Sequence, residues 1–169
     1  MEARATGLRT AAFIVLMVIS GCGASDLHKN EAANAPPTGG HWYPIPALTP
    51  GHLCTRQDPD FDELRYQEQI SHCRRNVTKS TRIAVSEPYG VSEDELENYQ
   101  VDHLIPLALG GSNARENLWP VAYEQARLKA KFEYQTYLEL KEGQIGQKAA
   151  IEKIRRWVRD NLVNGASIR

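Results

Sequence analysis

The residues of this chain that could do chemistry begin with an acid and an imidazole side by side, Asp102 and His103. A neutral imidazole with an ordinary pKa near ~6.5 can take a proton from water around neutral pH, so His103 is a candidate general base. The carboxylate of Asp102 is a hard oxygen ligand of the kind that Mg²⁺ or Mn²⁺ prefers. A base and a metal-bound phosphate are the groups that hydrolysis of a phosphodiester needs. Because an acid beside a histidine is common in proteins, only the surrounding sequence can indicate whether this pair belongs to a catalytic site.

The pair lies in a short segment that predicts a β-strand. Residues 101–107 are mostly apolar and β-prone, and Pro106 and Gly110-Gly111 then end the strand and allow a turn. A second short apolar stretch follows at 117–120, and a charged, helix-favouring segment runs over 123–141. Neighbours on a regular strand point to opposite faces, so the acid and the imidazole can act on one phosphate only if the strand bends or ends there.

Two short strands joined by a loop and followed by a helix, with Asp-His on the first strand and Asn at the second, resemble the HNH (ββα-metal) nuclease motif. The run from Tyr99 to Pro120, YQVDHLIPLALGGSNARENLWP, is similar to that of exported bacterial HNH-type proteins. The resemblance implies an α+β fold, with a small ββα-metal core and flanking helices over residues 51–165. It also implies a monomeric, metal-dependent endonuclease that acts on nucleic acid, with DNA favoured over RNA.

The resemblance assigns roles to individual residues. Asn117 corresponds to the family's middle Asn, whose side-chain amide would hold the loop and orient the base, so it joins His103 as a catalytic residue. The family generally completes its metal site with a further polar residue on the helix, but this chain has Ala126 there. Glu124 is chemically adequate as a substitute ligand beside Asp102; otherwise water and substrate oxygens would fill the coordination sphere of Mg²⁺ or Mn²⁺, with Zn²⁺ a further possibility.

The alanine leaves a second interpretation open. A catalytically degenerate HNH-fold lipoprotein would bind nucleic acid or a protein partner without cleavage.

Three basic residues are candidates for contacts with phosphate: Arg74, Arg75 and Lys129. Arg74 and Arg75 directly follow a cysteine, although an ordinary surface pair is the alternative. Residues 121–169 carry ten Lys or Arg and six Asp or Glu, an excess that favours a nucleic-acid backbone, while a solvated helix of mixed charge explains the same count. The formal net charge of the whole chain is −1, so no overall basic field indicates such a partner.

Residues 1–21 are typical of a bacterial lipoprotein signal peptide. Two arginines precede an apolar run over 11–19 that is too short to span a membrane as a stable helix. The run ends in Ile-Ser-Gly-Cys, which resembles a lipobox and implies cleavage before Cys22 and a lipid on its thiol; a plain signal peptide with a chance cysteine is the alternative. We therefore expect a protein exported to the cell envelope and anchored to a membrane at Cys22, followed by a flexible tether over 22–50.

The two other cysteines, Cys54 and Cys73, predict a disulfide in an oxidising compartment. A bridge between them would stabilise the fold by about 3 kcal/mol by the chain-entropy argument. A zinc site that uses the neighbouring His52 and His72 is the alternative, although neither a C-x-x-C nor an H-x-x-x-H pattern is present.

The remaining patterns bound the fold. A chain of 169 residues with 41% hydrophobic and 24% charged residues is typical of one globular domain. We predict a helix over 61–71, a strand over 81–85, a short helix over 93–98 that starts with a capping box, the helix over 123–141 and an amphipathic helix over 151–162. The helix over 123–141 has two apolar faces, which predicts that it is sandwiched between packing partners. One face consists of Tyr123, Ala126, Ala130, Tyr134, Tyr137 and Leu138, and the other of Leu128 and Phe132.

Overall fold

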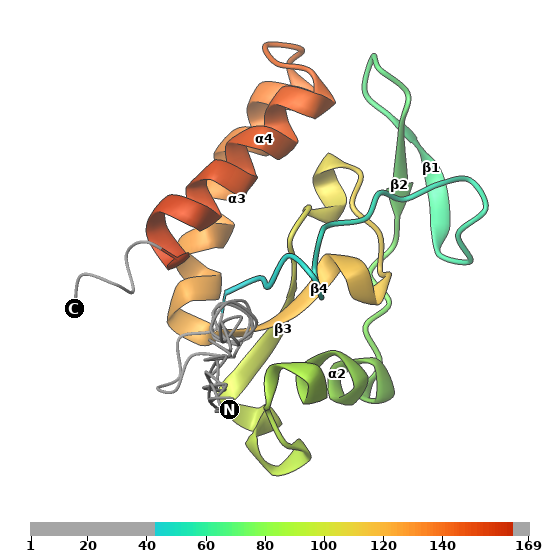
Figure 1. The fold of residues 1–169 in the computed structure, drawn as a ribbon. Helices are drawn as coiled ribbons and strands as arrows, with labels where there is room; N and C mark the ends of the chain where they lie inside the picture. Colours follow the sequence, from blue (N-terminus) through green and yellow to red (C-terminus); the bar gives the residue numbers. More distant parts are fainter. Residues whose placement is uncertain (1–42, 164–169) are drawn as a thin grey trace, which may run out of the picture. The chain divides into compact units, whose positions relative to one another are not determined.

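The computed structural model describes residues 43–163, and the fold over this range is α+β (Figure 1). It contains two separate two-stranded antiparallel sheets and several helices. The predicted signal peptide, the lipidation site Cys22 and the predicted tether up to residue 42 lie outside the described residues. Within the described range, no helix combines the length and the apolar character that crossing a membrane requires.

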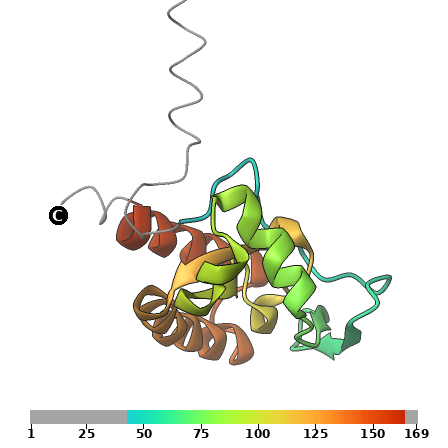
Figure 2. The ribbon, with the colours of Figure 1, turned by 90° about the horizontal axis from the view of Figure 1, so that it is seen from below.

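The central hairpin consists of β3 (Tyr99–His103) and β4 (Leu118–Ala122), paired antiparallel over their full length. The connecting loop contains two 3₁₀ turns, η3 (Leu107–Leu109) and η4 (Arg115–Asn117). These are the two short strands and the loop that the sequence predicts. β4 is fully buried up to Val121, because α2 (Lys79–Ser86) packs against the hairpin from one side and α3 (Tyr123–Lys141) from another (Figure 2).

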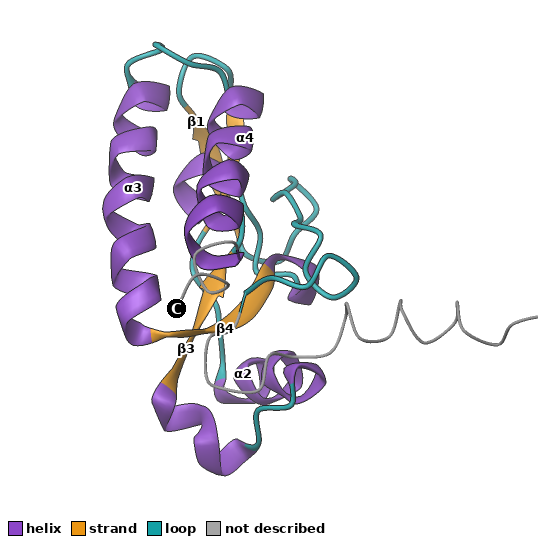
Figure 3. Cartoon of the chain, turned by 60° about the vertical axis from the view of Figure 1, so that its left-hand side comes forward, coloured by secondary structure: helices purple, strands orange, loops and turns teal. Residues whose placement is uncertain are grey.

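The α3 helix (Tyr123–Lys141) follows β4 directly and has the predicted bounds. A tight turn leads to α4 (Gln147–Val158), which continues into the π-helical η5 (Arg159–Val163). Figure 3 shows α3 and α4 side by side and antiparallel. The apolar face of α4 forms much of the core between them, since Ile154 is 1% exposed.

The predicted helix over 61–71 is wrong: this segment forms a second hairpin, β1 (Phe61–Arg65) and β2 (Ile70–Cys73). Tyr66 and Gln69 adopt positive φ angles of 62° and 54°, which reverse the chain and exclude a continuous helix. Just before this hairpin, the carboxylate of Asp58 accepts hydrogen bonds from the backbone and side chain of Thr55 within a turn.

The predicted strand over 81–85 is also wrong, because the chain forms α2 (Lys79–Ser86) here. The side chain of Thr78 accepts a hydrogen bond from the backbone N–H of Thr81, an N-cap that favours the helix over the strand propensity of the residues. α2 leads through the 3₁₀ turn η1 (Glu87–Tyr89) to η2 (Glu93–Asn98), which has the predicted capping box but 3₁₀ geometry.

Residues 43–50, assigned to the tether by composition, pack on the domain. Ile45 is 4% exposed, and Thr49 donates a hydrogen bond to the carbonyl of Leu118 at 2.8 Å and bonds the hydroxyl of Tyr89 at 2.7 Å. The predicted start of the domain at residue 51 is therefore too late.

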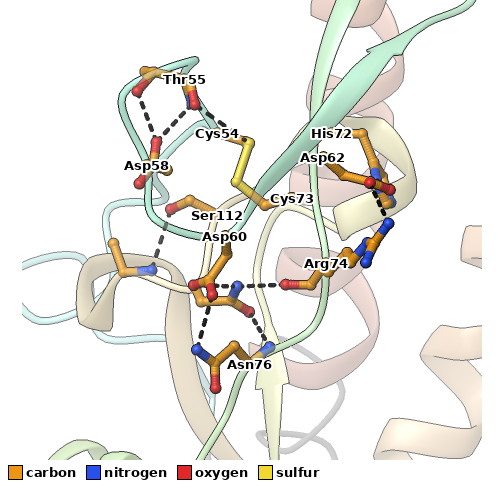
Figure 4. Close-up of a disulfide and its surroundings, with 12 residues drawn as sticks. Cys54, Thr55, Asp58, Asp60, Asp62, His72, Cys73, Arg74, Asn76 and Ser112 are labelled. Atoms are coloured by element: carbon orange, nitrogen blue, oxygen red, sulfur yellow. Dashed lines mark hydrogen bonds and ion pairs between the residues drawn. A yellow bond between two sulfur atoms is a disulfide. The ribbon is translucent and has the colours of Figure 1, made fainter.

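The disulfide between Cys54 and Cys73 is confirmed, with an S–S distance of 2.03 Å (Figure 4). It joins the segment before β1 to the end of β2, and Cys73 is fully buried. The alternative zinc site is wrong, because both sulfurs are consumed in the bridge. The ring of His52 bonds the hydroxyl of Ser112 at 2.9 Å instead.

Candidate functional site

The candidate site lies at the end of β3, where Asp102 and His103 are placed on opposite sides of the strand. Asp102 is 9% exposed and bonds the side chain of Lys129 on α3. His103 is 3% exposed and bonds Arg75 and Asn113. The alternation of side chains along a strand therefore holds for the pair, and the two groups have different surroundings.

The imidazole of His103 has a defined tautomer. Its Nε2 lies 3.1 Å from Oδ1 of Asn113, and its Nδ1 lies 3.3 Å from Nη1 of Arg75. Since a guanidinium only donates, Nδ1 carries the lone pair and Nε2–H donates to the amide oxygen. The orientation of that amide is fixed by its nitrogen, which donates to Oδ2 of Asp60 at 3.0 Å and to the carbonyl of Arg74 at 2.7 Å.

His103 is neutral at neutral pH. Burial lowers its pKa from 6.5 to about 4, and the nearby positive charges of Arg75 and Lys129 act in the same direction. The hydrogen bond with Asn113 and the charge of Asp102 oppose this shift in the pKa without reversing it. The ring is thus held in the protonation state that a general base requires.

Asp102 belongs to a buried ion cluster with Lys129 and Glu133. The ammonium of Lys129 donates to Oδ2 of Asp102 at 3.0 Å, to the backbone carbonyl of His103 at 2.7 Å, and to Oε1 of Glu133. Lys129 is fully buried and also lies over the ring of Trp119, 5.1 Å from its centroid. The predicted contact of Lys129 with phosphate is wrong, because its ammonium is directed into the fold and held by three acceptors.

Charge holds this cluster together. Burial disfavours the charged form of Lys129, but attraction to Asp102 and Glu133 outweighs burial and raises its pKa. Burial raises the pKa of Glu133, the ammonium opposes this, and repulsion from Asp102 adds to it. Lys129 is therefore a permanent internal cation shared by two carboxylates.

The two predicted arginines have different positions. Arg75 is at the site: besides its contact with His103, its Nη2 donates to the carbonyl of Val101 at 3.0 Å. The Arg74 side chain is 78% exposed and forms an ion pair with Asp62 at 2.7 Å, visible in Figure 4. That ion pair lowers the pKa of Asp62.

Asn117 holds the loop, as the resemblance implies. It is fully buried; its Oδ1 accepts from the N–H of Ile105 at 2.9 Å, and its Nδ2 donates to the carbonyls of Ile105 and Ser112, both at 2.9 Å. The loop passes so close that a Cβ on Gly111 would lie 1.8 Å from the carbonyl oxygen of Ile105, which explains the glycine. Asn117 acts on the loop and makes no side-chain contact with the His103 ring.

The predicted second metal ligand is not brought to Asp102. The side chain of Glu124 is 78% exposed and pairs with Arg127, while Ala126 is buried. The carboxylate that the fold does bring near Asp102 is Glu133, through the shared ammonium. Two ligand-like groupings exist elsewhere in residues 43–163; one contains the disulfide, and in the other the acids pair with arginines.

Sequence reasoning missed Asn113 and Glu133. Asn113 follows the glycine pair and Ser112, where loop residues usually serve the turn, so its contact with the ring is visible only in three dimensions. The contact of Glu133 could have been predicted, because Glu133 lies one helical turn after Lys129 and this spacing favours an ion pair.

Comparison of the chain with protein-family models, with curated proteins and with solved structures gives no match. The functional interpretation therefore rests on the residues and the geometry of the site.

Proposed function

We propose that this protein is an HNH-type endonuclease that hydrolyses phosphodiester bonds in nucleic acid, with His103 as the general base. The observation that carries the proposal is the state of the ring: it is neutral, its Nε2–H is held by Asn113, and its Nδ1 lone pair faces the guanidinium of Arg75. A base beside a phosphate-binding group is the arrangement that activation of water next to a phosphodiester requires.

Arg75 supplies the second component. Its planar guanidinium suits bidentate binding of phosphate oxygens, and it lies within 3.3 Å of the basic nitrogen. A phosphate bound there comes next to Nδ1, and the contact between Nδ1 and the guanidinium gives way to a water molecule. His103 takes a proton from that water at Nδ1 while Asn113 keeps the ring oriented. The resulting hydroxide attacks phosphorus, the P–O bond to the leaving oxygen breaks, and that oxygen takes a proton from solvent water.

A divalent metal ion would compete with Lys129 for these carboxylates. Mg²⁺ is commonly held by one or two carboxylates and keeps several waters. Asp102 and Glu133 are the acids that the fold brings together, but both bond the ammonium of Lys129, so that metal binding requires the ammonium to move aside. A bound metal would polarise the phosphate and stabilise the leaving oxygen. Residues 102 and 133 would hold it; Glu124 would not, because it projects into solvent.

The first test is cleavage itself. Purified protein should nick supercoiled plasmid with Mg²⁺ or Mn²⁺ and lose this activity in EDTA, and Asp102→Asn should require more metal for the same rate. Glu124→Gln is the matched control, since its exposed carboxylate should be dispensable. Cleavage that persists undiminished in EDTA, or that depends on Glu124 and not on Asp102, would contradict the proposed roles.

Two observations favour the non-catalytic alternative: Asp102 is already paired with the ammonium of Lys129, and His103 is only 3% exposed. A degenerate HNH-fold protein would show salt-sensitive binding to nucleic acid without metal-dependent cleavage. The plasmid assay and a binding titration on the same preparation separate the two functions.

We also propose that the protein is exported and anchored in the bacterial cell envelope through a lipid on Cys22. The disulfide between Cys54 and Cys73 supports an oxidising compartment. Mass spectrometry of the protein from membranes should find a mature chain that begins at a lipid-modified Cys22. A chain that retains residues 1–21, or one with an unmodified Cys22, would contradict the anchor.

A further inference from the structure

One face of α3 is only partly covered by the other elements within residues 43–163. Six residues spaced by three or four positions define it, and we call it the α3 stripe: Tyr123, Arg127, Lys131, Tyr134, Tyr137 and Lys141. The predicted packing of the apolar face that contains Tyr123 and Tyr134 is wrong at these two residues, because Tyr123 is 53% exposed and Tyr134 is 57% exposed. Tyr137, from the same predicted face, is partly buried and packs against the core. α3 instead packs through its other sides, where Ala126, Lys129, Thr136 and Leu140 are buried.

Two of the three aromatic rings of the stripe, those of Tyr134 and Tyr137, lie close to each other and to a cation. The centroids of Tyr134 and Tyr137 are 6.0 Å apart, and Nζ of Lys141 lies 5.8 Å from the centroid of Tyr137. Tyr66, in the turn of the first hairpin, supports Tyr137 from behind at 6.3 Å. Tyr134 is thus an exposed ring on a supported aromatic pair.

The charges of the stripe are complementary to a polyanion. Lys131 and Lys141 have no ion-pair partner among residues 43–163, whereas Arg127 pairs with Glu124. The other acids within α3 are directed elsewhere: Glu133 contacts the buried Lys129, and Glu139 pairs with Lys153 of α4. Exposed rings interleaved with lysines are a combination that binds bases by stacking and phosphates by charge.

We propose that the α3 stripe binds single-stranded nucleic acid, with one base stacked on Tyr134 and the backbone along Lys131 and Lys141. A duplex keeps its base faces covered, so stacking on an exposed ring selects single strands. The inference rests on the proposed function for its biological meaning, because it names the class of substrate. Glu133, directly before Tyr134 in the chain, belongs to the ion cluster behind His103, which connects the stripe to the site.

Fluorescence anisotropy with a labelled oligothymidylate, in EDTA so that no metal-dependent cleavage occurs, tests this directly. Tyr134→Ala should weaken binding about tenfold, whereas Tyr134→Phe should bind as the parent does, because stacking needs the ring and not the hydroxyl. Leu128→Ala is the matched control: Leu128 is 54% exposed on the same helix but lies off the stripe. Lys131→Gln should weaken binding and reduce its salt dependence.

The inference is overturned if Tyr134→Ala binds the oligonucleotide like the parent, if Leu128→Ala weakens binding as much as Tyr134→Ala does, or if a duplex binds as tightly as single strands. Binding of anionic phospholipid vesicles in place of the oligonucleotide would assign the stripe to a membrane surface and likewise overturn it. His103→Ala separates this inference from the proposed function. If both His103→Ala and the parent bind single strands through Tyr134 but neither cleaves, the nuclease proposal fails and the binding role of the α3 stripe stands. If the parent cleaves and Tyr134→Ala changes neither binding nor cleavage, the nuclease proposal stands and the binding role of the stripe fails.

Discussion

Replacement of the internal cation, Lys129→Met, is the sharpest perturbation of the site that the structure offers. Methionine keeps an unbranched stem of similar volume and removes the ammonium. The variant leaves Asp102 and Glu133 facing each other in a buried site, and the carbonyl of His103 loses its donor. Removing one partner of a buried ion pair typically costs about 3–5 kcal/mol, since the remaining charge is uncompensated.

That loss is a large share of the unfolding free energy of a domain of this size, which is about 5–15 kcal/mol. At about 4 °C per kcal/mol, we expect the Tm to fall by about 12–20 °C. Urea denaturation followed by circular dichroism measures the free energy, and an unchanged slope with denaturant shows that both proteins unfold the same structure. The deficit should shrink on acidification, because burial and repulsion from Asp102 raise the pKa of Glu133 and its protonation in the variant relieves that repulsion.

Lys131→Met is the matched control, because Lys131 lies exposed on the same helix and should change the free energy of unfolding by at most about 0.5 kcal/mol. A double variant, Lys129→Met with Glu133→Gln, should be less destabilised than the sum of the two single variants, with a coupling energy of about 1–3 kcal/mol. If Lys129→Met costs no more than Lys131→Met, the buried ion cluster is wrong.

Three further predictions concern the loop, the imidazole and the disulfide. Asn117→Ala should lower the free energy of unfolding by about 2–4 kcal/mol, because it leaves buried backbone groups unpaired; denaturation at constant pH checks this, and a loss below 0.5 kcal/mol would contradict it. The depressed pKa of His103 predicts that its contribution to stability is constant above the unfolded pKa of ~6.5, falls by about 3 kcal/mol as the pH drops towards about 4, and then levels off. The difference between parent and His103→Gln in unfolding free energy across this pH range isolates the effect, and a difference independent of pH would refute it. Replacing Cys54 and Cys73 by serine should lower the free energy of unfolding by about 3 kcal/mol, measured by thermal or urea unfolding. Dithiothreitol should reduce the native bridge only when denaturant is present, because Cys73 is buried. Rapid reduction of the folded protein would refute that burial.

Local sequence patterns predict the central hairpin, its loop and the two C-terminal helices, because residue propensity, apolar periodicity and turn residues all favour the same elements there. The run around Asp102 and His103 combines β-prone residues with Pro106 and a glycine pair, and α3 has a helical period over its whole length. The segments predicted wrongly are those where a short-range pattern competes with a long-range constraint. Residues 61–71 are helix-compatible by composition, but two left-handed positions and the bridge at Cys73 fix them as a hairpin.

Four residues of the candidate site could be predicted from the sequence. His103, Asp102 and Asn117 follow from the motif, and Arg75 follows from its place after Cys73. The partners that determine their state do not: Asn113 reaches the ring from the loop, and Lys129 is turned inwards by two carboxylates that lie 31 residues apart in the chain, Asp102 and Glu133. These contacts depend on burial and on the direction of each side chain, and residue spacing alone predicts neither.

The most direct test of the central claim is the cleavage rate of His103→Ala beside that of the parent, at one Mn²⁺ concentration and neutral pH. Loss of a general base predicts a rate lower by about 10²–10⁴-fold, with the fold of the variant verified by circular dichroism. A folded His103→Ala that cleaves as fast as the parent would contradict the account.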